Sequence, residues 1–194
     1  MARTKEFDPD AALQSALELF WRRGYEATSV ADLVEHLGIG RASLYATFGS
    51  KHELYLKALD RYGQAQNPRL TRELSRPGPV LPAVRAVVRR FAAEATAGAS
   101  REHGCLVTNT AVELAPHDAA AARRVEQSWD HVETLLHSAL ARARAQGELA
   151  ADRDPLALAR MLLVLLQGLR VVGKASPDAA RVRDAAEQAL ALLD

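Results

Sequence analysis

The residues whose types and spacing could do chemistry lie mainly in positions 28–51, which have the layout of a helix-turn-helix. Apolar residues recur at helical spacing from Val30 and stop at Gly38, and a very short helical segment follows from Arg41 to Phe48. Burial of the apolar side chains between the two helices would set the second helix at an angle that fits a DNA major groove. The side chains predicted to be buried there are Leu33, Leu37, Ile39 and Leu44. Because any small helical domain contains such a pair, the spacing alone also leaves a purely structural role open.

Side chains that could catalyse a reaction or bind a metal are not organised into a site. The sequence contains no glycine-rich phosphate loop, no His-x-x-x-His or Glu-x-x-His pair, and no Ser/His/Asp set with a characteristic spacing. The histidines are scattered, and His36 and His52 are interpreted as solvated surface residues. We therefore expect neither an enzyme nor a protein with a cofactor or metal.

The single cysteine, Cys105, allows two interpretations. It has no partner for an internal disulfide and no neighbours at zinc-ligand spacing, which fits a reducing compartment. It follows His103-Gly104 at the start of a predicted helix, where a thiol pKa can be lowered, so a thiol-based sensor of oxidants or electrophiles is one interpretation. The other is an inert, small core residue.

Length and composition describe an ordinary globular protein. The chain has 194 residues, 48% of them hydrophobic and 25% charged, with a net charge of +1. Basic and acidic residues nearly balance within the first 63 positions, so bulk charge does not indicate a nucleic-acid binder. No apolar run follows the first residues as in a secretory signal, and the longest apolar run, Met161 to Leu166, is short for a membrane span. We expect a cytoplasmic protein without a membrane role.

Apolar residues recur at helical spacing along the whole chain, which predicts an all-α fold of about nine helices. A first helix begins at Asp8-Pro9 and ends at Gly24, and Ser50-Lys-His-Glu53 predicts a capping box that starts the fourth. A proline- and glycine-rich stretch from Asn67 to Pro82 is predicted to be a connector, which divides the chain into domains 1–65 and 66–194. Five further helices are expected at about 80–98, 105–115, 119–146, 155–173 and 177–193.

The sequence around the predicted helix-turn-helix closely resembles the amino-terminal domain of tetracycline-repressor (TetR/AcrR) family regulators. The resemblance covers about residues 8–60 without a gap and is most specific in the Leu-Tyr-x-x-Phe-x-Ser-Lys motif at positions 44–51. It implies an amino-terminal three-helix DNA-binding domain followed by a larger helical domain for ligand binding and dimerisation. It also implies that the DNA-binding positions are Thr28, Gly40, Arg41, Ala42, Ser43, Tyr45, Ala46, Thr47 and Lys51.

The resemblance implies chemical roles for the main residues in this set. Arg41 would bond a guanine edge or a phosphate, beside short groove-facing side chains. Tyr45 would anchor a phosphate through its hydroxyl, the alternative being a buried packing aromatic. Lys51 and Thr28, each near a helix amino terminus, would attract phosphates. At positions 46 and 47, relatives often carry larger polar or histidine side chains, so base readout by Ala46 and Thr47 is expected to be limited.

Ahead of these helices, Arg3 and Lys5 could form a flexible arm against the DNA backbone or minor groove, or belong to a disordered tail.

The carboxy-terminal half is expected to hold an effector pocket and the dimer contact. The candidate pocket residues are the few large or polar groups on otherwise apolar helices, namely Phe91, Cys105, Asn109, Trp129, Met161, Gln167 and Arg170. The resemblance implies a homodimer through the last two helices. This chain offers apolar surface for such a contact, because residues 156–172 are apolar nearly all round and an apolar stripe runs from Val182 to Leu193. Completion of the subunit's own core is the alternative use of both helices.

The sequence thus predicts a transcriptional repressor that a small-molecule effector releases from a palindromic operator in double-stranded DNA. A twofold dimer requires half-sites about 34–36 Å apart, or a multiple of that spacing. A transcriptional activator and a redox or electrophile sensor that uses Cys105 are the alternatives.

Overall fold

Residues 7–176 and 178–193, the part described by the computed structural model, form ten α-helices and no strand. The all-α prediction is confirmed, and the helix not predicted from sequence is the short α6 between α5 and α7. The elements are α1 (Pro9–Arg23), α2 (Val30–Leu37), α3 (Arg41–Phe48), α4 (Lys51–Leu74), α5 (Leu81–Thr96), α6 (Gly98–His103), α7 (Leu106–Glu113), α8 (Ala119–Ala145), α9 (Pro155–Ala175) and α10 (Ala179–Ala191). Arg3 and Lys5, which the sequence analysis assigned to an arm or a tail, lie outside the described residues.

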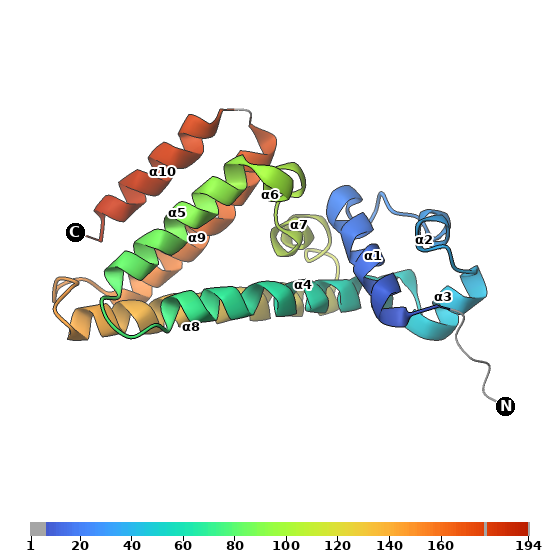
Figure 1. The fold of residues 1–194 in the computed structure, drawn as a ribbon, viewed down its shortest axis with the longest axis horizontal. Helices are drawn as coiled ribbons and strands as arrows, with labels where there is room; N and C mark the ends of the chain where they lie inside the picture. The colour runs from blue at the N-terminus through green and yellow to red at the C-terminus, as the bar shows by residue number, and fades with distance from the viewer. Residues whose placement is uncertain (1–6, 177, 194) are drawn as a thin grey trace.

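Helices α1, α2 and α3 form a small head at one end of the molecule (Figure 1). Asp8 caps α1, and Gly38 ends α2 in the left-handed conformation with φ 64° that glycine adopts without strain. The complete capping box is at Ser29 and Asp32, whereas at Ser50 only the hydroxyl half is formed, with the Glu53 N–H as donor. These caps fix where each short helix begins and ends.

Helix α4 corrects the prediction of a connector that starts at Asn67. It continues past Pro68 to Leu74 and joins the head to the rest of the molecule (Figure 1). A proline inside a helix removes one backbone hydrogen bond, but Leu70 and Leu74 on the last turns are buried in the carboxy-terminal core. That burial holds the helix together where the local sequence predicts a break.

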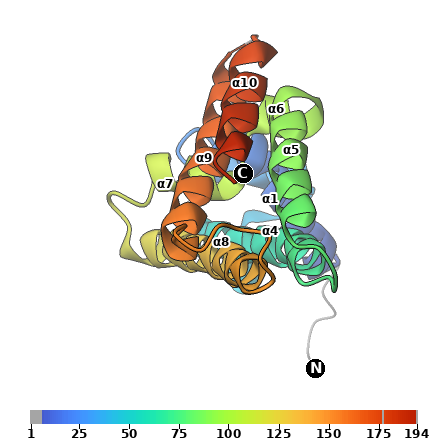
Figure 2. The ribbon, with the colours of Figure 1, turned by 90° about the vertical axis from the view of Figure 1, so that its left-hand side faces the viewer.

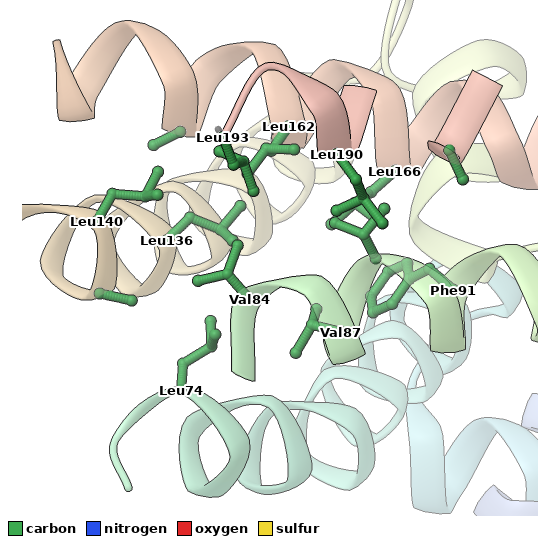
Figure 3. Close-up of a cluster of buried hydrophobic side chains, with 14 of the residues drawn as sticks. Leu74, Val84, Val87, Phe91, Leu136, Leu140, Leu162, Leu166, Leu190 and Leu193 are labelled. Carbon is green, nitrogen blue, oxygen red and sulfur yellow. The ribbon is translucent and has the colours of Figure 1, made fainter. Parts of the chain in front are cut away.

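The carboxy-terminal core is built from α5, α8, α9 and α10 together with the end of α4. Figure 3 shows its large side chains pointing toward one another from these helices. The labelled members are Leu74, Val84, Val87, Phe91, Leu136, Leu140, Leu162, Leu166, Leu190 and Leu193. Viewed end-on, α4 and α8 lie along one side and α5, α9 and α10 rise from them (Figure 2).

A second buried cluster joins the head to α7 and the start of α8. It contains Phe20, Leu33, Leu44 and Tyr55 from the head and α4, and it also contains Leu106 of α7. The two clusters therefore meet along α4, and the predicted boundary at residue 65 lies inside a continuous helix. Helix α7 is therefore packed directly against the head.

The apolar stripe of α10 has a different place from the one predicted for it. Val182, Ala186 and Leu190 are buried inside the subunit, where α10 packs on α5 and α9. The stripe thus completes the subunit's own core, which is the alternative use named for it above, and the pairing of the last two helices stays a prediction.

Helix α9 keeps an apolar face that its own subunit leaves open. Val164 is 72% exposed and Val171 is 49% exposed, and Gly168 lies between them on the same side. Among the described residues, α9 is also the one helix long and apolar enough to cross a membrane, with a mean hydropathy of 1.7. The uninterrupted apolar run from Met161 to Leu166 is too short to indicate the length of this apolar helix, because Gln167 and Arg170 interrupt it. In the fold, α9 packs against α5, α8 and α10, and 28% of its most apolar 18-residue stretch is buried in the subunit.

Candidate nucleic-acid interface and internal cavity

Helix α3 presents most of its surface to solvent. Only Leu44 and Phe48 turn inward, with exposed fractions of 0% and 4%, which confirms their assignment to the core. Arg41, Ala42, Ser43, Tyr45 and Ala46 are exposed together with Gly40, and Thr47 is partly exposed. The two inward residues are four positions apart, so they fix one side of the helix and leave the rest convex and open.

The charged and aromatic groups on α3 are available for contact. Tyr45 is 40% exposed, so its side chain is not buried in the core, and the guanidinium carbon of Arg41 lies 5.9 Å from the centre of its ring. Arg41 has no ion-pair partner among the residues that the structure describes. No side chain caps the amino end of α3 at Gly40, which leaves the first backbone N–H groups of the helix free to bind an anion.

Lys51 is the first residue of α4, and its ammonium group lies 4.1 Å from the centre of the Tyr25 ring. The contact holds a positive charge at the amino terminus of α4, directly after the turn that follows α3. The nearby Lys57 donates to the carbonyl oxygen of Phe48 at 3.3 Å, which stabilises the carboxyl end of α3.

The structure corrects the role expected for Thr28. Its side chain is fully buried, and its hydroxyl donates to the carbonyl oxygen of Gly24 at 2.7 Å. The hydroxyl therefore closes the turn between α1 and α2 instead of facing a phosphate. The sequence placed it wrongly because Ser29, one residue later, is the true cap of α2.

The head is tied to the rest of the chain by polar contacts from α7. Both carboxylate oxygens of Glu113 accept hydrogen bonds, at 3.1 Å from the Tyr25 N–H and at 2.9 Å from the Glu26 N–H. The indole N–H of Trp21 donates to the carbonyl oxygen of Gly104 at 3.0 Å. Glu113 thus holds the loop that precedes α2 against α7, and Trp21 of α1 is bonded to the segment just before α7.

A small cavity lies between α4, α5, α7, α8 and α9, with a free volume of about 50 Å³. Five of the seven predicted pocket residues line it, namely Phe91, Cys105, Trp129, Gln167 and Arg170. Asn109 lies elsewhere, in a groove near Trp21, where it donates to the His103 carbonyl oxygen, and Met161 packs against the carboxy-terminal core. Those two are therefore not brought to this cavity.

Sequence reasoning missed part of the cavity wall. The missed residues are Tyr62, Gly63, Gln66, Asn67, Leu70, Arg90, Val107, Ser128 and Val132. Five of them, Tyr62, Gly63, Gln66, Asn67 and Leu70, lie on one face of α4 at i, i+1, i+4, i+5 and i+8, and that helical spacing was the available signal. This spacing was overlooked because the connector predicted from Asn67 ended the helix too early.

Cys105 is buried at the start of α7 next to Arg170. Burial alone would raise the pKa of the thiol, but the Arg170 guanidinium and hydrogen bonds from Thr108 and Tyr62 outweigh burial, so the thiol pKa lies below its usual value. Burial also raises the pKa of Tyr62 well above its usual value, which keeps its phenol protonated. The cavity thus places a neutral phenol and an acidified thiol beside one mostly buried guanidinium.

No group of three or more potential metal ligands occurs in residues 7–176 and 178–193. None of the residues that line the cavity carries a carboxylate.

Comparisons with known proteins agree with the arrangement of a head and a helical body. Residues 12–58 match the family described as bacterial regulatory proteins, tetR family, and residues 80–189 match the tetracyclin repressor-like carboxy-terminal domain. The HTH-type transcriptional regulator YezE of Bacillus subtilis (strain 168) is 38% identical, over the whole of both chains. The HTH-type transcriptional repressor ComR of Escherichia coli (strain K12) is 34% identical over 87% of this chain and 80% of its own.

The solved structures lead to the same family. A cysteine-substituted TetR family transcriptional regulator CifR, in complex with 26 bp of double-stranded operator DNA, superposes with a TM-score of 0.85. It is 32% identical, and each chain is covered completely. These relatives are transcriptional regulators, which confirms that the chain is not an enzyme. A helix-turn-helix head held on a helical body, matched over its full length by such regulators, makes this chain a member of the tetR family of bacterial transcriptional regulators.

Proposed function

We propose that this protein is a cytoplasmic, homodimeric repressor that a small-molecule effector releases from a palindromic operator. The observation that supports this best is α3, a short helix anchored by two buried side chains with its remaining surface open. Two relatives of similar length support the same reading, since CifR is solved on operator DNA and ComR is named a repressor.

In this proposal the exposed residues of α3 enter the major groove. Arg41 reads a guanine edge or binds a phosphate, while Ser43, Ala46 and Thr47 make short contacts with base edges. Tyr45 and Lys51 bind phosphates on either side of the groove, and the open amino end of α3 at Gly40 and Ala42 lets the backbone approach closely. The phosphate contacts position the head, and the base contacts select the sequence.

Arg41→Ala is expected to weaken binding to the specific operator by about 1–3 kcal/mol, with little effect on non-specific DNA, because it removes a bidentate base contact. Lys51→Ala is expected to weaken binding to all sequences and to reduce the slope of affinity against salt by about 1, because it removes one phosphate contact. The operator is obtained by selection from random duplexes and titrated at several salt concentrations. Unchanged operator affinity and unchanged salt dependence in both variants would contradict the assignment of this interface.

The dimer contact in this proposal is the exposed face of α9. Val164, Gly168 and Val171 form an open apolar stripe, and the 74% exposed Val112 of α7 lines the same groove as Val171. A glycine without neighbours at the centre of the stripe lets a second helix approach closely. Twofold pairing through this face would place two heads on one side of the assembly.

An effector in the internal cavity would reach the head through α7. Cys105 and Val107 of α7 line the cavity, and Thr108 donates to Gln167 of α9 at 2.7 Å. At the far end of the same helix, Glu113 holds the loop before α2. A shift of α7 on ligand binding would therefore change the spacing of the two recognition helices. By linkage, operator DNA would weaken effector binding by the same factor.

A second candidate function, a thiol-based sensor, is favoured by the acidified thiol of Cys105. Because Cys105 is the single cysteine, alkylation by N-ethylmaleimide reports on it directly in a mass spectrum. We expect the labelling rate to rise with pH through a midpoint below the usual thiol pKa, and to shift to higher pH in Arg170→Met, which lacks the stabilising charge. Loss of operator binding on labelling supports the sensor. Loss that persists in Cys105→Ser excludes it.

A further inference from the structure

Two residues that line the internal cavity have buried hydrogen-bond donors without an acceptor among the described residues. The Nε1–H of Trp129 and the Nε–H of Arg90 are buried without an acceptor, and both residues line the cavity. Each of these atoms can only donate. An unsatisfied buried donor is unfavourable, so the cavity is suited to a ligand that supplies acceptor oxygens.

The cavity also carries the positive charge of Arg170, whose acidic neighbours are the Cys105 thiol and, at longer range, Glu94. Arg69 and Arg90 are paired with Glu73 and Glu94 in a network whose charges balance, with Arg90 2.7 Å from Glu73 and 3.1 Å from Glu94. Arg170 is outside that network, and no carboxylate lies within ion-pair distance of it in the part of the chain that the structure describes. Its guanidinium carbon lies 4.4 Å from the centre of the Phe91 ring, and the same guanidinium hydrogen-bonds the Cys105 thiol.

The shape of the cavity limits the size of the ligand. Its free volume of about 50 Å³ corresponds to on the order of four water molecules. Leu70, Val107 and Val132 give it an apolar wall opposite the polar groups. A surface depression between α4 and α8 shares Gly63, Asn67, Val107 and Ser128 with the cavity, so these four residues lie between the cavity and the surface.

We propose that this cavity binds a short-chain carboxylate, with the carboxylate on Arg170 and Trp129 and the hydrocarbon part against the apolar wall. The inference rests on the proposed function, because it assigns a chemical class to the effector. A carboxylate supplies the missing negative charge and acceptor oxygens in one planar group, which matches the geometry of a guanidinium. It would also remove the need for a charge on Cys105, so carboxylate binding and ionisation of that thiol oppose each other.

The test is calorimetric titration of the full-length protein with acetate, propionate and butyrate, each compared with its uncharged amide. We expect at least one acid to bind at millimolar concentration and its amide to bind at least about tenfold more weakly, because the amide lacks the charge-assisted bond. Arg170→Met is expected to abolish acid binding, Trp129→Phe to weaken it, and Arg170→Lys to retain part of it. Arg181→Met, an arginine on the exposed surface of α10, is the matched control and is expected to bind the acid like the unaltered protein.

Three results would overturn the inference: no binding by any of the three acids, equal binding of acid and amide, or acid binding that persists in a folded Arg170→Met. The comparison of acid with amide uses the unaltered protein, so it decides the question even if a variant does not fold. Operator binding by the acid-free protein is measured in parallel. Its absence would refute the proposed function, whereas acid binding of the expected pattern would still establish the carboxylate site.

Discussion

Val164→Asp is expected to convert the protein from a dimer to a monomer and to lower operator affinity by about 10²–10⁴. Val164 is the most exposed large apolar residue of α9 and lies on the proposed dimer face. Twofold symmetry would bring two aspartates close together in an interface without water, where their repulsion and loss of hydration oppose pairing. A monomer holds one recognition helix, so the second half-site no longer contributes through effective concentration.

Sedimentation velocity at micromolar concentration provides the measurement, since the subunit mass of 21.0 kDa separates clearly from twice that value. Ala86→Asp, which adds the same charge on the exposed side of α5, is the control and should remain a dimer. A Val164→Asp protein that remains a dimer would show that the dimer interface does not lie on this face of α9. A monomeric unaltered protein at this concentration would refute the dimer altogether.

Gly173→Ala is expected to destabilise the fold by about 3 kcal/mol or more. Gly173 lies on α9 where that helix crosses α5, and a Cβ atom there would clash with the carbonyl oxygen of Ala95. That contact is with backbone, which no side-chain rotation relieves, so the two helices must separate and open the carboxy-terminal core. The lost packing would reach Leu169 and the other α9 side chains buried beside it.

Gly63→Ala is the matched control for this effect. Gly63 is also inside a long helix, but the nearest atom to a Cβ there is an Asn67 side-chain nitrogen at 3.9 Å, an ordinary contact. Because alanine favours helix over glycine, this control should gain up to about 1 kcal/mol. Urea denaturation of both variants gives the two free energies of unfolding. A Gly173→Ala protein as stable as the unaltered one would show that α5 and α9 do not approach as closely as described.

The features that local sequence controls were predictable. Helix starts follow from capping chemistry at Asp8, and the positive φ at Gly38 follows from the need to end α2 before α3 begins. The inward side chains Leu44 and Phe48 follow from helical spacing, and that spacing also implies the open surface around Arg41. These predictions depend on residues within a few positions of one another.

The sequence by itself determined the all-α fold, the position of the helix-turn-helix and the exposed surface of α3, because each is set by periodicity and capping over short stretches. Only the tertiary structure decided that α4 continues through Pro68, that Thr28 is buried, that the apolar stripe of α10 belongs to the subunit core, and that Arg170 lies beside Cys105 in the wall of a cavity. These features depend on contacts between residues far apart in the chain. Burial of Leu70 and Leu74 outweighs the local cost of a proline, and no local pattern specifies which distant side chains will share a cavity.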